Sequence, residues 1–137
     1  MKILVANDGS PGGEKAVLGA LDLAKRISVG VTMVCVEAVD RFPAVVDVVP
    51  EAQSEPTSTF EPIVEADKAR AQEWGTPFEA IITGGDPVQR IIEIIEQGGY
   101  DLLVVGRTGH AALFERIIGS VADRLVALAP CNVLVIK

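Results

Sequence analysis

Short runs of aliphatic residues alternate along the chain with segments in which apolar residues recur every three or four positions. The aliphatic runs predict buried β-strands at residues 2–8, 31–37, 78–84, 101–106 and 132–136. The helical spacing predicts amphipathic α-helices over residues 12–28, about 62–74, 86–99 and about 119–129. Because strand and helix alternate, the pattern predicts an α/β fold with a parallel, doubly wound sheet.

Polar residues followed by proline mark where two of these helices begin. Ser10 precedes Pro11, and Asp86 precedes Pro87, so each helix has a side-chain acceptor at its start and proline in its first turn. The helix after Asp86 carries one apolar stripe, formed by Val88, Ile91, Ile92 and Ile95.

The segment from 40 to 62 interrupts this rhythm. It contains four prolines, with serine and threonine clustered over 54–59. We predict a long flexible loop there, ahead of the helix over about 62–74. The valines of this loop could fold onto the body of the protein, onto a partner or over a ligand, and a disordered excursion is the competing interpretation; they are Val45, Val46, Val48 and Val49.

The composition fits a single domain of this class. Of the 137 residues, 49% are hydrophobic and only 4% are aromatic, an aliphatic content typical of strands that are covered on both faces. We therefore treat residues 1–137 as one domain. The net charge of −7 argues against nucleic-acid binding, which needs a basic surface to displace counterions.

The cysteines and the apolar runs indicate where the protein resides. Cys35 and Cys131 lie in apolar stretches, which favours buried free thiols over a disulfide. The apolar run at 3–6 is too short for a signal peptide, and Pro130 and Asn132 interrupt the longest later run. We therefore expect no membrane-spanning segment and a cytoplasmic location.

Glycine occurs at the ends of two predicted strands. Asp8-Gly9 follows the first strand and Gly106 closes the fourth. In doubly wound sheets, ligands bind beyond the carboxyl ends of the strands, where the winding reverses. If these two strands are neighbours, both turns line one crevice, and this crevice is the predicted ligand site.

The stretch from 106 to 124 has the composition of an anion site. Gly106 and Gly109 permit close backbone approach and positive φ, and successive exposed N–H groups can form a nest for an anion. Gly119-Ser120 lies where a helix begins, and the N–H groups and dipole of a helix N-terminus favour a phosphate. The basic residues of this stretch are Arg107, His110, Arg116 and Arg124.

A purely structural interpretation explains some of the same residues. Ser120 and Asp123 have the spacing of a weak capping box, and Gly106 could merely end a strand. The segment GSPGGEKA (9–16) approaches a P-loop, but Glu14 stands where glycine is needed and Ala16 where serine or threonine would contact a metal ion.

The glycine pattern carries a resemblance to a known family. Gly106-x2-Gly109-x9-Gly119-Ser120 resembles the ATP-binding signature of the universal stress protein family. The segments ILVANDGS (3–10), DLLVVG (101–106) and APCNVLVIK (129–137) resemble the first, fourth and last strands of that family with their turns. Departures are small: Arg107-Thr108 replaces a common serine followed by a basic residue, and Asn132 stands where proline is common.

The resemblance implies a five-stranded parallel, Rossmann-like sheet in the order 3-2-1-4-5, flanked by about four helices, with an adenine nucleotide bound between strands one and four. It implies ATP as the ligand, possible neutralisation of its phosphates by magnesium or manganese, and contacts to the base or ribose from Asp8, Val36 and their neighbours. The residues that it implies for the nucleotide site are Ala6, Asn7, Asp8, Val36, Val105, Gly106, Arg107, Gly109, Gly119, Ser120 and Val121.

Two of these assignments have structural alternatives. Asp8 could stabilise the turn that contains it, and Val36 could belong to the core. The chain shows no nucleophile–base pair, and His110 is its only histidine. We therefore expect a stress-response binding module that is regulated by its nucleotide, with slow ATP hydrolysis at most. The alternative is a nucleotide-free universal stress protein that acts only as a dimeric interaction protein.

The last predicted strand also bears on assembly. Residues 132–136 form an apolar strand at the end of the sequence, and an exposed apolar edge strand favours pairing with another strand. The resemblance implies that this strand pairs with its twin across a twofold axis, which would give a homodimer.

Overall fold

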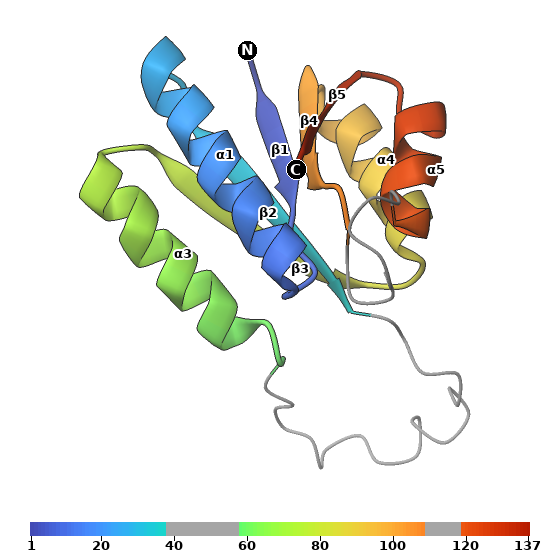
Figure 1. The fold of residues 1–137 in the computed structure, drawn as a ribbon, viewed down its shortest axis with the longest axis horizontal. Coiled ribbons are helices and arrows are strands. Elements are labelled where there is room, and N and C mark those ends of the chain that lie inside the picture. The colour runs from blue at the N-terminus through green and yellow to red at the C-terminus, as the bar shows by residue number, and fades with distance from the viewer. Residues whose placement is uncertain (38–57, 109–118) are drawn as a thin grey trace.

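The computed structural model describes residues 1–37, 58–108 and 119–137. In these residues strands and helices alternate, as Figure 1 shows. The elements are β1 (Ile3–Ala6), α1 (Pro11–Ile27), β2 (Val31–Glu37), α3 (Glu61–Trp74), β3 (Phe78–Gly84), α4 (Pro87–Gly98), β4 (Leu102–Gly106), α5 (Ser120–Leu128) and β5 (Asn132–Ile136).

All the strands belong to one parallel sheet in the order β3-β2-β1-β4-β5. The short strand β1 lies at its centre, where Ile3 pairs with Val31 of β2 on one side and with Leu102 of β4 on the other. The order implied by the family resemblance is therefore confirmed. Because β1 and β4 are neighbours, the winding reverses between them, and both of their carboxyl ends open at the same edge of the sheet.

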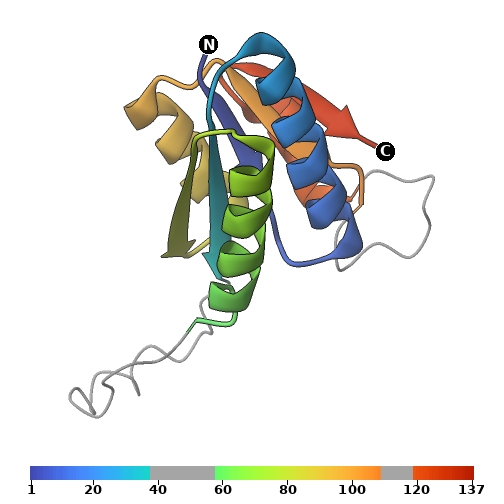
Figure 2. The same cartoon turned by 90° about the vertical axis from the view of Figure 1, so that its left-hand side faces the viewer.

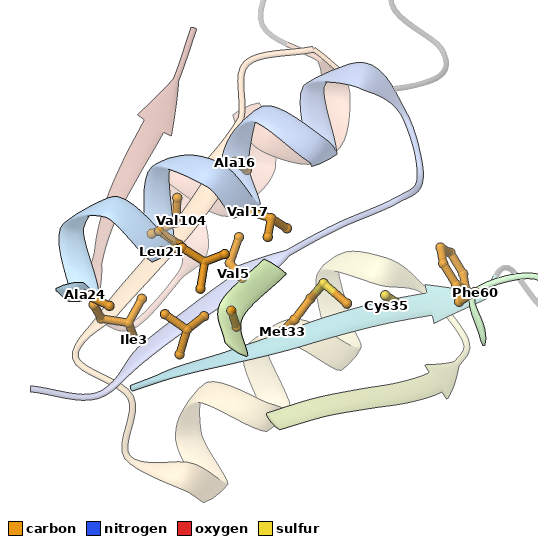
Figure 3. Packing of buried hydrophobic residues seen from close by; sticks show 13 residues of the cluster. Ile3, Val5, Ala16, Val17, Leu21, Ala24, Met33, Cys35, Phe60 and Val104 are labelled. Carbon is orange, nitrogen blue, oxygen red and sulfur yellow. The ribbon is translucent and has the colours of Figure 1, made fainter. Parts of the chain in front are cut away.

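The helices cover the sheet on both faces. Helices α1 and α3 lie side by side on one face, and α4 and α5 lie together on the other (Figures 1 and 2). Alternate residues of the central strands point to opposite faces: Ile3 and Val5 pack beneath α1, whereas Leu4 packs with α4 and α5. Figure 3 shows the first of these clusters, in which Leu21 of α1 lies over β1.

The helix starts confirm the predictions from the sequence. Ser10 is the N-cap of α1, and its hydroxyl oxygen accepts a hydrogen bond from the Gly13 amide at 3.1 Å. Asp86 caps α4, and its carboxylate accepts from the Gln89 amide at 2.9 Å. In both helices proline occupies the first turn, where a backbone N–H would have no acceptor within the helix, so its absence costs nothing.

Some predicted boundaries were wrong. Strand β1 ends at Ala6 and not at residue 8, because Asn7 and Asp8 turn the chain with their side chains. Helix α3 begins at Glu61, so the predicted loop ends before residue 62. The greater part of that loop, with its valines, lies outside the described residues.

Two further expectations concern the cysteines and the membrane. Cys35 is a buried free thiol, as predicted, but Cys131 is free and only partly buried, because it precedes the edge strand β5. Over residues 1–37, 58–108 and 119–137, every helix is too short or too polar to cross a membrane.

Candidate functional site

A pocket of about 250 Å³ opens where the carboxyl ends of β1, β2 and β4 meet the first turns of α4 and α5. It lies in the crevice that the sequence predicted from the turns after strands one and four. Of the predicted site residues, those that line it are Ala6, Asn7, Asp8, Val36, Val105, Gly106, Gly119, Ser120 and Val121. Arg107 is not among the described lining residues, and Gly109 lies outside the described residues.

One end of the pocket is apolar. Val34 and Val36 approach it from β2, and Ile91 and Leu125 approach it from α4 and α5. Val34, Ile91 and Leu125 are almost fully buried, because they belong to the core cluster that α4 and α5 form with the sheet. The sequence predicted their burial but gave no signal that they also border a pocket. Val36 serves as both core and pocket wall.

The turn between β1 and α1 is held by its own side chains. The Asn7 side-chain oxygen accepts from the Gly9 amide at 2.9 Å, and the Asp8 carboxylate accepts from the amide and the hydroxyl of Ser10. Gly9 has a φ of 84°, a conformation that a side chain would disfavour. The structural role considered for Asp8 is thus present, while its exposed side chain also borders the pocket.

Gly106 permits a close approach of two backbone segments. A Cβ on Gly106 would lie 2.3 Å from the Gly12 carbonyl oxygen, and one on Gly12 would lie 1.9 Å from the Thr108 carbonyl oxygen. The expectation that Gly106 adopts positive φ was wrong; it is the end of a regular strand. Its function is to let β4 approach the first turn of α1.

The start of α5 presents main-chain amides to the pocket. Gly119 is the N-cap, and Ser120 is the first helical residue, so the predicted alternative of a Ser120 capping box was wrong. The Gly119 amide itself donates to the Arg107 carbonyl oxygen at 2.7 Å. The amides of Ser120, Val121 and Ala122 have no acceptor within the helix, and an N-cap glycine offers none from a side chain.

The Arg107 main chain connects this site to the edge of the sheet. Besides accepting from Gly119, it donates from its own amide to the Ile136 carbonyl oxygen of β5 at 2.9 Å. Its side-chain Nε is buried without a hydrogen-bond partner among the described residues. Arg124 is exposed on α5, and His110 and Arg116 lie outside the described residues.

Charge is scarce in the described part of the pocket lining, where Asp8 is the only charged residue.

Burial, together with the carboxylates of Asp67, Asp8 and Glu37, raises the pKa of the Cys35 thiol from 9.0 to about 12, so this thiol stays protonated. The described residues contain no group of three histidine, cysteine, aspartate or glutamate side chains that could hold a metal ion. Main-chain amides and apolar side chains therefore dominate this part of the site.

Comparison with protein families agrees with this fold. The model of the universal stress protein family matches residues 1–137. The chain belongs to the universal stress protein family. It is 32% identical over 141 residues to the universal stress protein MJ0531 of Methanocaldococcus jannaschii, a match that covers 99% of this chain and 81% of the relative.

Solved structures share the fold. The structure of the protein MJ0577 superposes with a TM-score of 0.84 at 25% identity and covers 99% of this universal stress protein and 95% of the other chain. A universal stress protein solved in complex with cAMP superposes with a TM-score of 0.74 at 24% identity, covering all of this chain and 97% of the other. At 24% identity, this second likeness establishes a shared architecture.

Proposed function

We propose that this universal stress protein binds an adenine nucleotide, with ATP as the ligand, and that the bound nucleotide regulates its interactions. The observation that carries the proposal is that one pocket joins an apolar end to a helix N-terminus whose first amides have no acceptor within the helix. An apolar slot suits the flat face of a base, and helix amides suit a phosphate.

We propose a definite order of the ligand along the pocket. The base would lie among Val34, Val36 and Ile91, and the ribose would lie near Asp8 at the mouth of the pocket. The phosphates would lie against the amides of Ser120 and Val121. The volume of about 250 Å³ is slightly below the range typical of small-molecule sites, roughly 300–1,000 Å³, so part of a nucleotide would extend into solvent.

The same residues favour binding over catalysis. Rapid hydrolysis of ATP requires a group that positions water and a group that stabilises the transferring phosphoryl. Within the described lining, Asp8 is the only acid, and it is bonded to Ser10. We therefore propose slow hydrolysis at most. A magnesium or manganese ion would arrive bound to the phosphates.

The second of these solved proteins was determined in complex with cAMP, and an adenine nucleotide agrees with the chemistry proposed here. The proposal for this chain rests on its own pocket. The test is to purify the protein, denature it and analyse the supernatant by absorbance at 260 nm and by mass spectrometry. An adenine nucleotide in the supernatant, or binding of added ATP by calorimetry, is the expected result. An empty protein that ignores added ATP contradicts the proposal and favours the nucleotide-free alternative.

We also propose that the protein is a homodimer that pairs through β5. This strand is an edge of the sheet, and its Leu134 is 37% exposed. Unpaired backbone groups on an apolar edge favour association with another strand. Proline at Val133 or Val135 should yield monomers by light scattering, and an unchanged dimer mass would contradict this interface.

A further inference from the structure

A buried carboxylate of α3 contacts a residue that lines the pocket. Oδ2 of Asp67 accepts a hydrogen bond at 3.1 Å from Nδ2 of Asn7, a residue 60 positions earlier in the chain. Asp67 is 3% exposed and Asn7 is 4% exposed, so water does not compete for this bond. Asn7 lines the pocket, whereas Asp67 does not. Asp67 therefore contacts the site through Asn7.

The carboxamide of Asn7 has one orientation that satisfies its neighbours. Its oxygen accepts from the Gly9 amide, and its nitrogen faces the Asp67 carboxylate. A flipped carboxamide would place two donors, or two acceptors, against each other. Gly13 confines the group from the other side, because a Cβ there would lie 2.3 Å from the Asn7 side-chain oxygen.

The position of Asp67 on its helix is costly. The buried side chains of α3 are Asp67 and Ala71, so the helix places a carboxylate where an apolar residue would pack at lower cost. Burial raises the pKa of Asp67, while Arg70 and the bond from Asn7 act in the opposite direction. Such a cost is expected where the carboxylate has a purpose other than stability.

We propose that Asp67 is a positioning residue of the nucleotide pocket: it fixes the Asn7 carboxamide and thereby the turn 7–10, which presents Asp8 to the ligand. This inference rests on the proposed nucleotide binding. It makes α3 part of the site although the helix does not line it. The proposed ligand is still an adenine nucleotide. The inference adds Asp67 as the residue that positions the turn 7–10 in its pocket.

The charged groups around Asp67 define how it responds to pH. Arg70 on the same helix donates to its Oδ1 at 2.9 Å, Glu14 of α1 is bonded to Arg70 at 3.4 Å, and β2 contributes the protonated thiol of Cys35. A protonated Asp67 has one acceptor oxygen for two donors, Asn7 and Arg70, so it holds the carboxamide less firmly.

The first experiment measures the affinity for ATP by calorimetry in the wild type and in three single variants. Asp67→Leu removes both acceptors at similar volume and should weaken binding about tenfold. Asp67→Asn mimics the protonated acid and should weaken it about threefold at neutral pH. Arg70→Met is the matched control, because it removes the ion pair but leaves the bond to Asn7, and its affinity should stay within about twofold of the wild type.

A double-mutant cycle separates positioning from general stability. If Asp67 acts through Asn7, Asp67→Leu should have no further effect on affinity in an Asn7→Ala background. The pH profile gives a second measure. Wild-type affinity should fall as the solution is acidified through the pKa of Asp67, relative to Asp67→Asn, which should show no such step. Titration of the ligand is common to both proteins and cancels in this comparison.

The outcomes are distinct. A wild type that does not bind ATP contradicts the proposed function itself. If the wild type binds ATP and a folded Asp67→Leu binds it equally well, only the positioning role is overturned. The same holds if Asp67→Leu lowers the affinity in the Asn7→Ala background by the same factor as in the wild type. If Asp67→Leu does not fold, the pH profiles of ATP affinity of the wild type and of Asp67→Asn decide. Parallel profiles overturn the inference, and a step that is present in the wild type but absent in Asp67→Asn supports it.

Discussion

The two glycine-bearing walls of the pocket are built from different chemical groups. The turn at residues 7–13 is held by side chains that bond to one another and to neighbouring amides, and Gly13 leaves room for them. The start of α5 presents main-chain amides, and its N-cap is a glycine that contributes no side chain. Substitutions at the first wall should therefore affect ATP binding through side-chain identity and crowding. Substitutions at the second wall should affect it chiefly through the loss of an N–H.

The largest expected effect lies where the two walls are joined. In Gly106→Ala the new Cβ would meet the Gly12 carbonyl oxygen at 2.3 Å, and both groups belong to the backbone. Since neither can move cheaply, the free energy of unfolding should fall by about 2 kcal/mol, measured by urea denaturation. Nucleotide binding should be lost as well.

Gly19→Ala is the control for this substitution. Its Cβ would approach an end atom of the Ile136 side chain at 2.8 Å, and that atom can rotate away. Alanine also favours a helix interior over glycine. This variant should be as stable as the wild type, and an equal loss in both variants would contradict the argument from backbone crowding.

The second substitution crowds only the side-chain wall. Gly13→Ala would push against the Asn7 side-chain oxygen at 2.3 Å, while the start of α5 stays intact. We expect ATP affinity to fall about tenfold, with a loss of about 1 kcal/mol in stability. Removing the obstructing carboxamide tests the cause: Gly13→Ala should cost less stability in an Asn7→Ala background than in the wild type. Equal costs in the two backgrounds would place the strain elsewhere.

The third substitution removes an amide from the main-chain wall. Proline is well tolerated at the first position of a helix, and Gly119 has the extended ψ of 154° that a following proline requires. Ser120→Pro should therefore fold normally but weaken ATP binding about tenfold, because one N–H is lost. Ser120→Ala keeps this N–H and should change the affinity less than threefold. If alanine proved as damaging as proline, the hydroxyl and not the amide would bind the phosphate.

The contrast between the walls also explains what the sequence could predict. Strand runs, helix starts and the sheet order followed from local periodicity, N-cap residues and the family resemblance, and the structure confirmed them. The glycine pattern led to the start of α5, because that wall is contiguous in sequence. It did not reveal that the Gly119 amide is engaged by Arg107, since this bond depends on how the chain returns to the sheet.

The first wall was harder to predict because its parts are distant in sequence. Asn7 meets Asp67 only after α3 has packed beside α1, and no local pattern marks a buried aspartate in a helix. Gly12 and Gly13 belonged to a segment that failed as a P-loop, yet both are needed for close packing. The available signal was that α3 has few apolar residues on its buried side, which would have pointed to a polar role for Asp67.

The smallest expected effect is the pH dependence of stability that Asp67 contributes to the side-chain wall. Because burial raises its pKa above the ordinary 3.8, the folded state binds this proton more tightly than the unfolded state. The free energy of unfolding of the wild type should therefore decrease, relative to Asp67→Asn, as the pH rises through the folded-state pKa. Below the unfolded-state pKa the difference between the two proteins should be constant.

Urea denaturation of both proteins across this pH range measures the difference, and Ser120→Ala, which alters only the other wall, provides the baseline. A wild type that gains stability over Asp67→Asn as the pH rises would mean that Arg70 lowers the pKa of Asp67 more than burial raises it. The carboxylate would then be a stabilising partner of the ion pair, and Asp67 would contribute to stability at its buried position and not reduce it.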